Sequence, residues 1–412
     1  MEFIADFHIH SKYSRATSKE MDIAHLAEWA KLKGITLMGT GDFTHHLWLE
    51  ELKSHLEDVG NGLFKYQDVY FVLTTEISSI YSKNNRGYRI HNMIFSPSFK
   101  TTDKINETLS RMGNLASDGR PILGLDAAEL ARIVFDIDEN CMVVPGHIWT
   151  PWFSLFGSMS GFDRIEDCFE KQASKIFALE TGLSSDPAMN WRLSALDRFS
   201  LISNSDSHSP SKIGREANVF NCDLDYKTIR EVLRTKDKKR FLYTIEFFPE
   251  EGKYHFDGHR LCGVRQSPKE TKANNGRCPQ CGKSVTVGVV NRVEALADRP
   301  EGFILPHAIP FRNLIPFEEI VAEAKGLGKT SLAVEREYRS LVTKFQTEFN
   351  ILLRASESEL RQGLPPRIAE GVLRVRQGKV TIKAGYDGEY GIISIFGDED
   401  KPEKTEQQLS LF

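Results

Sequence analysis

The first 240 residues alternate short apolar runs with segments whose apolar residues recur at helical spacing. Residues 21–33 show the helical spacing and end before Gly34, a residue typical of a helix C-cap. This alternation of strands and helices predicts parallel strands joined by crossover helices, and therefore an α/β fold. The strand-like runs are residues 2–9, 35–42, 69–76, 88–96, 141–147, 176–182 and 199–208.

The pattern changes after residue 240. Residues 250–300 are rich in Gly, His, Cys and charge and too polar for a hydrophobic core. Residues 301–396 combine helical spacing over 318–326 and 334–355 with a predicted hairpin that turns at Gln377–Gly378. Charged residues 397–407 predict a disordered linker before a short apolar end. We therefore expect four parts: residues 1–240, 250–300, 301–396 and 397–412.

Composition narrows the class of protein. The chain has 412 residues, of which 40% are hydrophobic and 27% charged, values typical of a globular protein of two or three domains. It shows neither a signal peptide nor an apolar run long enough for a membrane helix. The isolated cysteines Cys141, Cys168 and Cys222 are typical of a reducing compartment, so we expect a cytoplasmic protein without a membrane partner.

Polar residues gather at the ends of the predicted strands, where barrels build active sites. His8 and His10 share one face of the first strand, which fits a metal site or a half-solvated edge. A single histidine is more often an ordinary structural residue, but chance does not account for five at strand ends beside acids. This set suits Zn²⁺, Mn²⁺ or iron, and its carboxylates can bridge two ions. The predicted metal ligands are His8, His10, Asp42, Glu76, His91, His147, Asp206 and His208.

A second metal site is predicted in the polar region. The pairs His259-x2-Cys262 and Cys278-x2-Cys281 have the spacing of a tetrahedral Cys₃His zinc site. His255 is the alternative fourth ligand. A redox-active pair is the competing interpretation, but no βαβ unit surrounds these cysteines. We expect a structural Zn²⁺ that lets the polar segment fold.

The strand-end residues resemble the polymerase-and-histidinol-phosphatase (PHP) family over residues 1–240: HxH on the first strand, a later Glu, two isolated histidines and a final SDxH. The resemblance implies a distorted (β/α)7 barrel that binds two or three divalent ions (Zn²⁺, Mn²⁺ or Mg²⁺) and hydrolyses phosphoesters. Two features depart from the family. The third ligand that the family has after HxH is missing here, and that segment contains Arg15 and Lys19 instead. The usual DH is replaced by GDFTHH, so we assign the ligand role to Asp42 and expect His45 and His46 at the surface. Two ions are therefore expected first.

Catalysis is assigned to three of these ligands. In this hypothesis water activated by the metal ions attacks phosphorus directly, without a covalent intermediate. Asp206 binds metal and orients the attacking water, and Glu76 and His208 complete the catalytic set.

Further motifs resemble the endonuclease Q family over nearly the whole chain: TGD at 40–42, TPW at 150–152, SNSDSHSP at 203–210 and DGHRLCGV at 257–264, followed by CPQCGK and RVEALADRP. The resemblance implies incision of DNA 5′ to uracil, hypoxanthine, xanthine or abasic sites, leaving a 3′-hydroxyl and a 5′-phosphate. It also implies that the damaged nucleotide is flipped out of the duplex. Trp149, Trp152 and Phe153 are candidates for reading that base, but they fit a hydrophobic core equally well.

The end of the chain resembles the motif by which bacterial proteins bind the sliding clamp, the second expected partner after damaged DNA. Its residues are Gln408, Leu409, Ser410, Leu411 and Phe412. The alternative is an ordinary frayed terminus.

No nucleotide cofactor is expected, since GLGKTS at 326–331 has Glu323 where a phosphate-binding loop needs its first Gly. Two other functions remain open at this point. One is a small-molecule phosphoesterase of the histidinol-phosphatase type, and the other is a non-catalytic clamp-bound repair adaptor.

Overall fold

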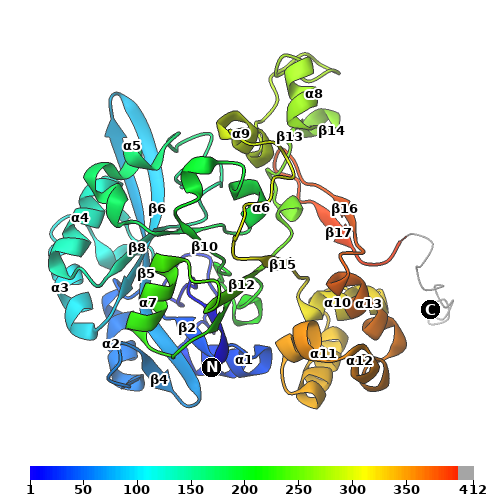
Figure 1. Cartoon of the computed structure of the whole chain (residues 1–412), viewed down its shortest axis with the longest axis horizontal. Helices are drawn as coiled ribbons and strands as arrows, with labels where there is room; N and C mark the ends of the chain where they lie inside the picture. The colour runs from blue at the N-terminus through cyan, green and yellow to red at the C-terminus, as the bar shows by residue number, and fades with distance from the viewer. Residues whose placement is uncertain (398–412) are drawn as a thin grey trace, which may run out of the picture.

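A ring of strands wrapped by helices forms the centre of the computed structural model, which describes residues 1–397 (Figure 1). β1, β2 and β5 run parallel, β6 is antiparallel to both β5 and β8, and β9 is parallel to β10. β8 lies beside β9, and a parallel bridge between Ile9 and Ser207 joins the segments that follow β1 and β10. The α/β prediction is confirmed, and the antiparallel β6 distorts the barrel. The ring strands are β1 (Glu2–Asp6), β2 (Leu37–Gly39), β5 (Val69–Lys83), β6 (Arg86–Ser96), β8 (Met142–Pro145), β9 (Ala178–Glu180) and β10 (Ser200–Ile202).

Further strands extend the sheet on both sides of the ring. β11 pairs antiparallel with β1, β12 antiparallel with β11, and β15 parallel with β12. Two of these strands, β12 and β15, come from beyond residue 240, so the later chain contributes to the barrel sheet. The additional strands are β3 (Glu57–Asp58), β4 (Phe64–Tyr66), β7 (Ile122–Leu123), β11 (Ala217–Asn221), β12 (Phe241–Glu246) and β15 (Phe311–Asn313).

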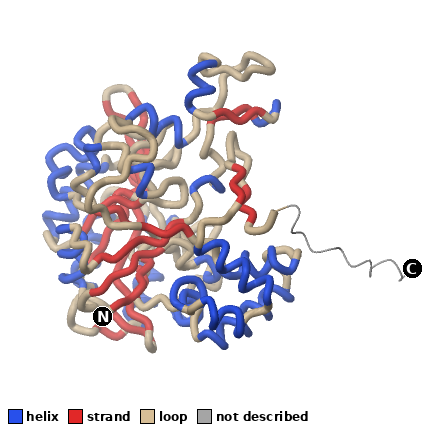
Figure 2. The backbone as a smooth tube through the Cα atoms, turned by 45° about the vertical axis from the view of Figure 1, so that its right-hand side comes forward, coloured by secondary structure: helices blue, strands red, loops and turns tan. Residues whose placement is uncertain are grey.

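Helices lie on the outside of the barrel strands (Figure 2). Their apolar residues join those of the strands in one buried cluster. The first helix begins where the Asp22 side chain accepts a hydrogen bond from the His25 N–H, and it ends at Gly34 with φ 89°. This is the helix that the spacing and the capping residue predict. The helices of this part are α1 (Ile23–Lys33), α2 (His46–His55), α3 (Phe99–Leu109), α4 (Ala127–Ile137), α5 (Ile165–Phe169), α6 (Pro187–Asn190) and α7 (Tyr226–Thr235).

The polar segment after β12 forms a small separate unit at the upper right of Figure 1. Its antiparallel strands carry little apolar surface, and its buried apolar cluster consists of Val264, Cys278 and Val285. α9 packs Val289 and Val293 into the main core, and the rest of the unit has little apolar surface to bury, so a metal ion bound there would add to its stability. Its elements are β13 (Asp257–His259), β14 (Val264–Gln266), α8 (Pro268–Ala273) and α9 (Val289–Leu296).

A cluster of helices follows, at the lower right of Figure 1. The hairpin predicted at Gln377–Gly378 is wrong: residues 366–376 form a helix that starts with Pro366 and buries Ile368, Val372 and Val375. The Arg376 side chain donates hydrogen bonds to the backbone oxygens of Ile351, Leu352 and Ala355, which fixes this helix on the preceding turn. The helices are α10 (Phe317–Lys325), α11 (Leu332–Phe345), α12 (Glu357–Gly363) and α13 (Pro366–Arg376), with a π-helical turn at Asn350–Arg354.

A short hairpin of β16 (Thr381–Lys383) and β17 (Ile392–Ser394) connects the helical cluster with the polar unit (Figure 1). The Gly388 N–H donates to the Lys253 carbonyl, and the Phe256 N–H donates to the Gly385 carbonyl. The Asp387 carboxylate accepts from the Arg260 N–H at 2.6 Å and from the Thr286 hydroxyl. Residues 381–394 therefore hold the segment 250–260 in place.

Within residues 1–397, no helix has both the length and the apolar character needed to cross a membrane.

Candidate active site

His8 and His10 follow β1, which ends at Asp6, and point into the barrel at the carboxyl end of that strand. Phe7 and Ile9 pack into apolar clusters on the other face, as the alternation of side chains along a strand predicts. His8 and His10 are 2% and 0% exposed. Two buried imidazoles on one face need partners, and the barrel supplies acids for them.

Each imidazole is held from behind by a carboxylate. His8 Nδ1 lies 2.9 Å from Glu180 Oε1, and His10 Nδ1 lies 3.0 Å from Asp42 Oδ1. This leaves the Nε2 atoms of both rings facing the Glu76 carboxylate, at 3.5 and 3.3 Å. Both Nε2 atoms are buried and form no hydrogen bond with any described residue. Histidines that ligate a metal usually have this arrangement: one ring nitrogen is held by a carboxylate, and the other is available to the ion.

Glu76 lies at the centre of the site and belongs to two clusters of candidate ligands. Its Oε1 is 2.7 Å from His91 Nδ1 and 3.1 Å from His147 Nε2, while its Oε2 faces His8 and His10. One carboxylate placed between two sets of imidazoles can bridge two ions. Candidate ligand atoms within 4.8 Å of one another occur in three barrel groups: His8, His10 and Glu76; His10, Asp206 and His208; and Glu76, His91 and His147.

Asp206 faces the same space from the segment after β10. Its Oδ1 is 3.2 Å from His10 Nε2 and 3.7 Å from His8 Nε2, and it is a further buried atom without a hydrogen-bond partner among the described residues. His208 lies at the rim, with its ring centroid 4.6 Å from that of His10. The predicted pair therefore lies beside both histidines of the first strand.

The charges of the site depend on one another. Burial alone would lower the pKa of His8 and His10, but the surrounding carboxylates outweigh it and raise the pKa of both well above the usual value. Burial would raise the pKa of Glu76 and Asp206, but neighbouring cationic side chains keep the pKa of both carboxyls well below the usual value. A metal ion must displace the imidazole protons, so its affinity increases with pH.

Three site residues adopt a left-handed backbone conformation that non-glycine residues rarely use. The φ angles are 50° at Asp42, 29° at His147 and 46° at Asp206. Such backbone costs about 1–3 kcal/mol per residue and persists where the surrounding structure fixes it, most often at functional sites.

Asp42 was predicted as a metal ligand, but its carboxylate is hydrogen-bonded to neighbouring residues. Besides His10, its carboxylate accepts hydrogen bonds from the Ser11 N–H and hydroxyl at 2.6 and 2.7 Å and from the Ser14 hydroxyl at 2.9 Å. It is absent from the ligand groups found among residues 1–397. Because these donors already occupy its oxygens, Asp42 orients His10 rather than facing an ion.

Two residues near the cluster are absent from the predicted ligand set. Glu180 orients His8 and also accepts the His147 N–H at 2.7 Å. Its place in the strand-like run 176–182, facing the same rim, makes it a candidate ligand or supporting residue from the sequence. Arg120 Nη1 lies 3.2 Å from Glu76 Oε2, but its sequence context gives no indication of this contact.

The polar unit brings its four predicted residues together. Ligand atoms of His259, Cys262, Cys278 and Cys281 lie within 4.8 Å of one another, and His259 Nδ1 is 3.6 Å from Cys281 Sγ. His255 is buried elsewhere and does not belong to this group. His259 is therefore the fourth member, and the set has the composition of a structural zinc site.

The aromatic candidates have different environments. Trp149 is fully buried and donates its indole N–H to Asn190 Oδ1 at 2.8 Å, so it belongs to the core. Phe153 is half-buried, with its ring centroid 4.9 Å from that of His91, and Trp152 packs edge-on against Tyr254. His45, expected at the surface, is buried with its ring stacked on Tyr13.

A cavity of about 140 Å³ lies next to these aromatics. Thr150 lines it and also contacts the metal cluster, since its hydroxyl is 3.1 Å from His147 Nδ1. His255 forms another wall. The cavity therefore has aromatic walls and lies beside the candidate metal site.

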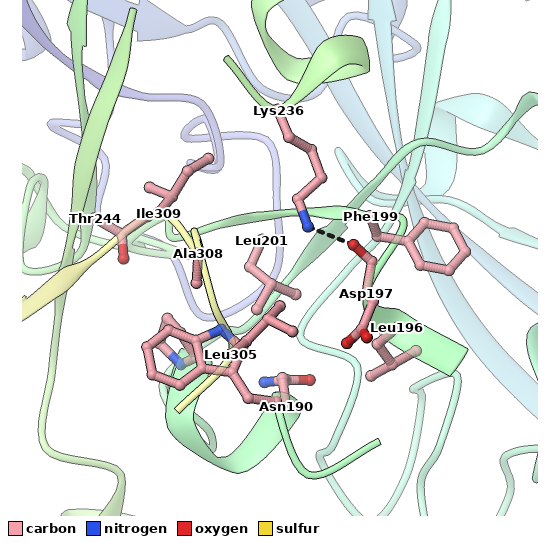
Figure 3. A pocket seen from close by; sticks show the side chains of 12 residues that line it. Asn190, Leu196, Asp197, Phe199, Leu201, Lys236, Thr244, Leu305, Ala308 and Ile309 are labelled. Atoms are coloured by element: carbon pink, nitrogen blue, oxygen red, sulfur yellow. Dashed lines mark hydrogen bonds between the residues drawn. The ribbon is translucent and has the colours of Figure 1, made fainter. Parts of the chain in front are cut away.

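A smaller cavity of about 20 Å³ lies under the loop 305–309 (Figure 3). Its walls are largely apolar, with Leu201, Leu305 and Ile309 around it, and Lys236 is bound to the Asp197 carbonyl at its edge. None of the candidate metal ligands lines it. We assign the chemistry to the barrel cluster instead.

Two curated relatives have sequences similar to this chain. It is 32% identical over 288 residues to the uncharacterized protein MJ0043 of Methanocaldococcus jannaschii, a match to 65% of this chain and 34% of that protein. The chain thus spans about a third of the length of that relative. It is 29% identical to the uncharacterized protein YqxK of Bacillus subtilis, over 94% of this chain and 98% of YqxK. Residues 316–379 also match the family model of the MJ0043 C-terminal domain.

Solved structures identify the family. The crystal structure of the lesion-specific endonuclease PfuEndoQ from Pyrococcus furiosus matches with a TM-score of 0.86 and 30% identity, over 98% of this chain and 96% of that one. The chain belongs to the endonuclease Q family. A second structure, endonuclease Q with a 27-mer duplex substrate carrying an abasic lesion at its active site, matches with a TM-score of 0.85 and 30% identity over 99% and 100% of the two chains. The endonuclease Q match includes the barrel, the polar unit and the helical cluster, so all three belong to the family fold.

Proposed function

We propose that this protein is a DNA repair endonuclease that hydrolyses the phosphodiester bond 5′ to a deaminated base (uracil, hypoxanthine or xanthine) or an abasic site. The products are a 3′-hydroxyl and a 5′-phosphate. The observation that carries the proposal is the match to a lesion-specific endonuclease over 98% of the chain, combined with buried ligand clusters that share Glu76. A relative crystallised with an abasic lesion at its active site supports the class of substrate.

The barrel residues fit divalent metal ions. The Nε2 atoms of His8 and His10 and Oδ1 of Asp206 are buried together and form no hydrogen bonds with described residues, so a cation bound between them would satisfy all three. Imidazole-rich groups with few carboxylates favour Zn²⁺ or Mn²⁺ over Mg²⁺. Bound ions supply Lewis acidity, which activates water and neutralises phosphate charge. The ligands we propose are His8, His10, Glu76, His91, His147, Asp206 and His208, for two ions, with three as the alternative.

The protein side chains position the reactants. Asp42 and Glu180 fix the two imidazoles of the first strand, so the ligand atoms are in place before substrate arrives. Asp206 lies at the open side of the cluster, with its side chain 26% exposed, where it can orient the attacking water. Glu76 and His208 complete the proposed catalytic set.

The cavity beside His147 is the proposed place for the damaged nucleotide. Trp152 and Tyr254 line it and can stack on a base, and the polar residues Thr150, Ser184 and Lys253 also line it. A flipped base needs both kinds of contact, and damaged pairs cost less to open. Phe153 packs against His91 and does not line this cavity, while Trp149 belongs to the core.

The polar unit is proposed to hold a structural Zn²⁺ and to contact the DNA backbone. Its surface carries exposed cations although the whole chain has a net charge of −4. A local basic surface is sufficient to bind phosphates. The exposed residues are Arg260, Arg265, Lys269, Lys272, Arg277 and Lys283.

The proposed clamp-binding residues Gln408, Leu409, Ser410, Leu411 and Phe412 lie outside the described residues. Their support is the sequence pattern of an extended peptide that presents apolar anchors. Deletion of residues 408–412 should abolish binding to a bacterial sliding clamp in a pull-down experiment and leave incision of short oligonucleotides unchanged. Retained clamp binding would reject the assignment.

The test of the function is incision of a labelled duplex carrying one deoxyuridine, deoxyinosine or abasic site, with Mn²⁺, Mg²⁺ or Zn²⁺. A single cut 5′ to the lesion, absent from the undamaged duplex and lost in Asp206→Ala, is expected. Asp103→Asn, a surface change in an exposed ion pair, is the matched control. Hydrolysis of a phosphomonoester without any cut in DNA would establish a small-molecule phosphoesterase instead, and no hydrolysis with any metal would favour the adaptor.

A further inference from the structure

Arg120 brings a guanidinium group to the carboxylate at the centre of the site. Its Nη1 is 3.2 Å from Glu76 Oε2, and Glu76 is fully buried while the Arg120 side chain is 27% exposed. Within residues 1–397 the hydrogen bonds of this guanidinium go to Glu76 through Nη1, so Nε and Nη2 keep free donors. Arg120 therefore lies between the buried cluster and the solvent side of the site.

The backbone around Arg120 fixes its position. Its N–H donates to Asp118 Oδ1 at 3.1 Å, the Gly119 N–H donates to the Tyr13 carbonyl at 3.1 Å, and the Ser78 N–H donates to the Pro121 carbonyl at 3.0 Å. A Cβ atom on Gly119 would lie 2.3 Å from Asp42 Oδ2, so this loop packs directly against the active-site carboxylate. Such close packing requires glycine and leaves the next residue little freedom to move.

Arg215 also lies near the site, but its guanidinium already donates to the backbone oxygens of Ser205 and Asp206. Residues 11–21 contain neither His nor Asp, and the Asp42 oxygens are occupied by His10, Ser11 and Ser14. A phosphodiester carries negative charge on two non-bridging oxygens, and this charge must be stabilised as water attacks. A guanidinium with free parallel donors matches phosphate geometry better than an ammonium does.

We propose that Arg120 is a further catalytic residue, which donates hydrogen bonds to a non-bridging oxygen of the scissile phosphate. The inference rests on the proposed phosphodiester hydrolysis. In that reaction the water oxygen forms the new bond to phosphorus, the bond from phosphorus to O3′ breaks, and a proton passes to O3′. Arg120 exchanges no proton in this sequence and stabilises the added negative charge.

The test compares Arg120→Met and Arg120→Lys with Arg15→Met. Arg15 pairs with the same Asp118 but has a side chain 81% exposed, so it is the matched control. For Arg120→Met we expect kcat on the lesion duplex to fall by about 10²–10³-fold, the usual loss when one transition-state donor is removed. Arg120→Lys should recover part of that loss, and Arg15→Met should keep the wild-type kcat.

Two readouts separate catalysis from a structural role. Metal content, measured by mass spectrometry, should be the same in Arg120→Met and wild type. Stereospecific sulfur substitution at the scissile phosphate should slow the wild type more for one isomer, and this difference should disappear in Arg120→Met. An unchanged kcat, or loss of metal from Arg120→Met, would overturn the proposal and leave Arg120 as a structural partner of Glu76.

A binding experiment distinguishes failure of this inference from failure of the proposed function. Calorimetric titration of the metal-loaded protein with inorganic phosphate should show weaker binding in Arg120→Met, by about tenfold for one lost charged hydrogen bond. If the wild type cuts no DNA but this difference persists, the proposed function fails and the Arg120 assignment remains. Equal phosphate binding in both proteins would count against Arg120 whatever the DNA result.

Discussion

Glu180 lies 2.9 Å from His8 Nδ1 and orients that imidazole toward Glu76. The same carboxylate accepts the backbone N–H of His147 at 2.7 Å. Glu180 is not itself in a group of candidate ligands, but it positions His8, which belongs to one group, and His147, which belongs to another.

Glu180→Ala should weaken metal binding without removing a ligand. Loss of such an outer carboxylate costs about 10–100-fold in metal affinity or activity. The measurement is incision rate against Mn²⁺ concentration, where the variant should need more metal and recover at saturation. Glu170→Ala removes a carboxylate that is 58% exposed and should leave the titration unchanged. A Glu180→Ala curve that coincides with wild type would contradict the assigned role.

Cys278→Ser should release one zinc ion per chain and loosen the polar unit. The unit's own apolar cluster consists of Val264, Cys278 and Val285, while Val289 and Val293 of α9 pack into the main core, so a bound ion would stabilise residues 257–288 most. Limited proteolysis should then cut within residues 257–288 while the barrel stays intact. Cys222→Ser, a buried cysteine outside the cluster, serves as the control. Unchanged zinc content and protease resistance in Cys278→Ser would reject the zinc site.

Lys33→Met should destabilise the protein strongly. Lys33 Nζ is 2.8 Å from Glu348 Oε2, and this ion pair between α1 and the helical cluster is almost completely buried. Removing one partner leaves a buried charge and costs about 3–5 kcal/mol of unfolding free energy. Urea denaturation measures the loss. Lys31→Met, on the same helix but in an exposed pair with Asp68, should change stability by less than about 1 kcal/mol.

Glu246 should make the stability depend on pH. Burial raises the pKa of its carboxyl to about 8 from 4.5, with nearby Asp186 adding to the effect, while the hydroxyls of Thr244 and Thr181 donate to it. Between these pH values the folded protein keeps a proton that the unfolded chain has released. The free energy of unfolding therefore falls as pH rises through this interval, by up to about 1.4 kcal/mol per pH unit.

Glu246→Gln removes this titration and should flatten the decline. Denaturation at pH 6 and pH 9 in parallel measures it, and Glu57→Gln at an exposed strand end should keep the wild-type slope. Equal slopes in Glu246→Gln and wild type would show that Glu246 is ionised in the folded protein at neutral pH.

Local patterns predicted the parts of the site that follow strand geometry. The period of two after β1 placed His8 and His10 on one face, and His147 and Asp206 met them because they follow the carboxyl ends of β8 and β10. Glu76 and His91 were predicted at strand ends but lie within the long antiparallel strands β5 and β6. Asp42 shows the limit of this reasoning. Its position at a strand end was clear, but its hydrogen bonds from Ser11 and Ser14 depend on tertiary folding.

Features set by distant contacts could not be predicted. Arg120 reaches Glu76 because Gly119 packs against Asp42, a contact between segments far apart in sequence. Residues 372–376 alternate apolar and charged residues like a strand, but the longer segment from Pro366 buries Ile368, Val372 and Val375 on one helical face. Trp149 and Trp152 are of the same type, and only the fold separates the core residue from the one at the cavity.

The hairpin of β16 and β17 has a consequence for protein synthesis. The barrel ligands lie between residues 8 and 208, so this part of the chain leaves the ribosome long before residues 381–394. Until those residues emerge, Lys253 and Phe256 lack the backbone partners that hold the Tyr254–His255 wall of the cavity. A growing chain can thus bring its candidate metal ligands together while one wall of this cavity is still unfinished.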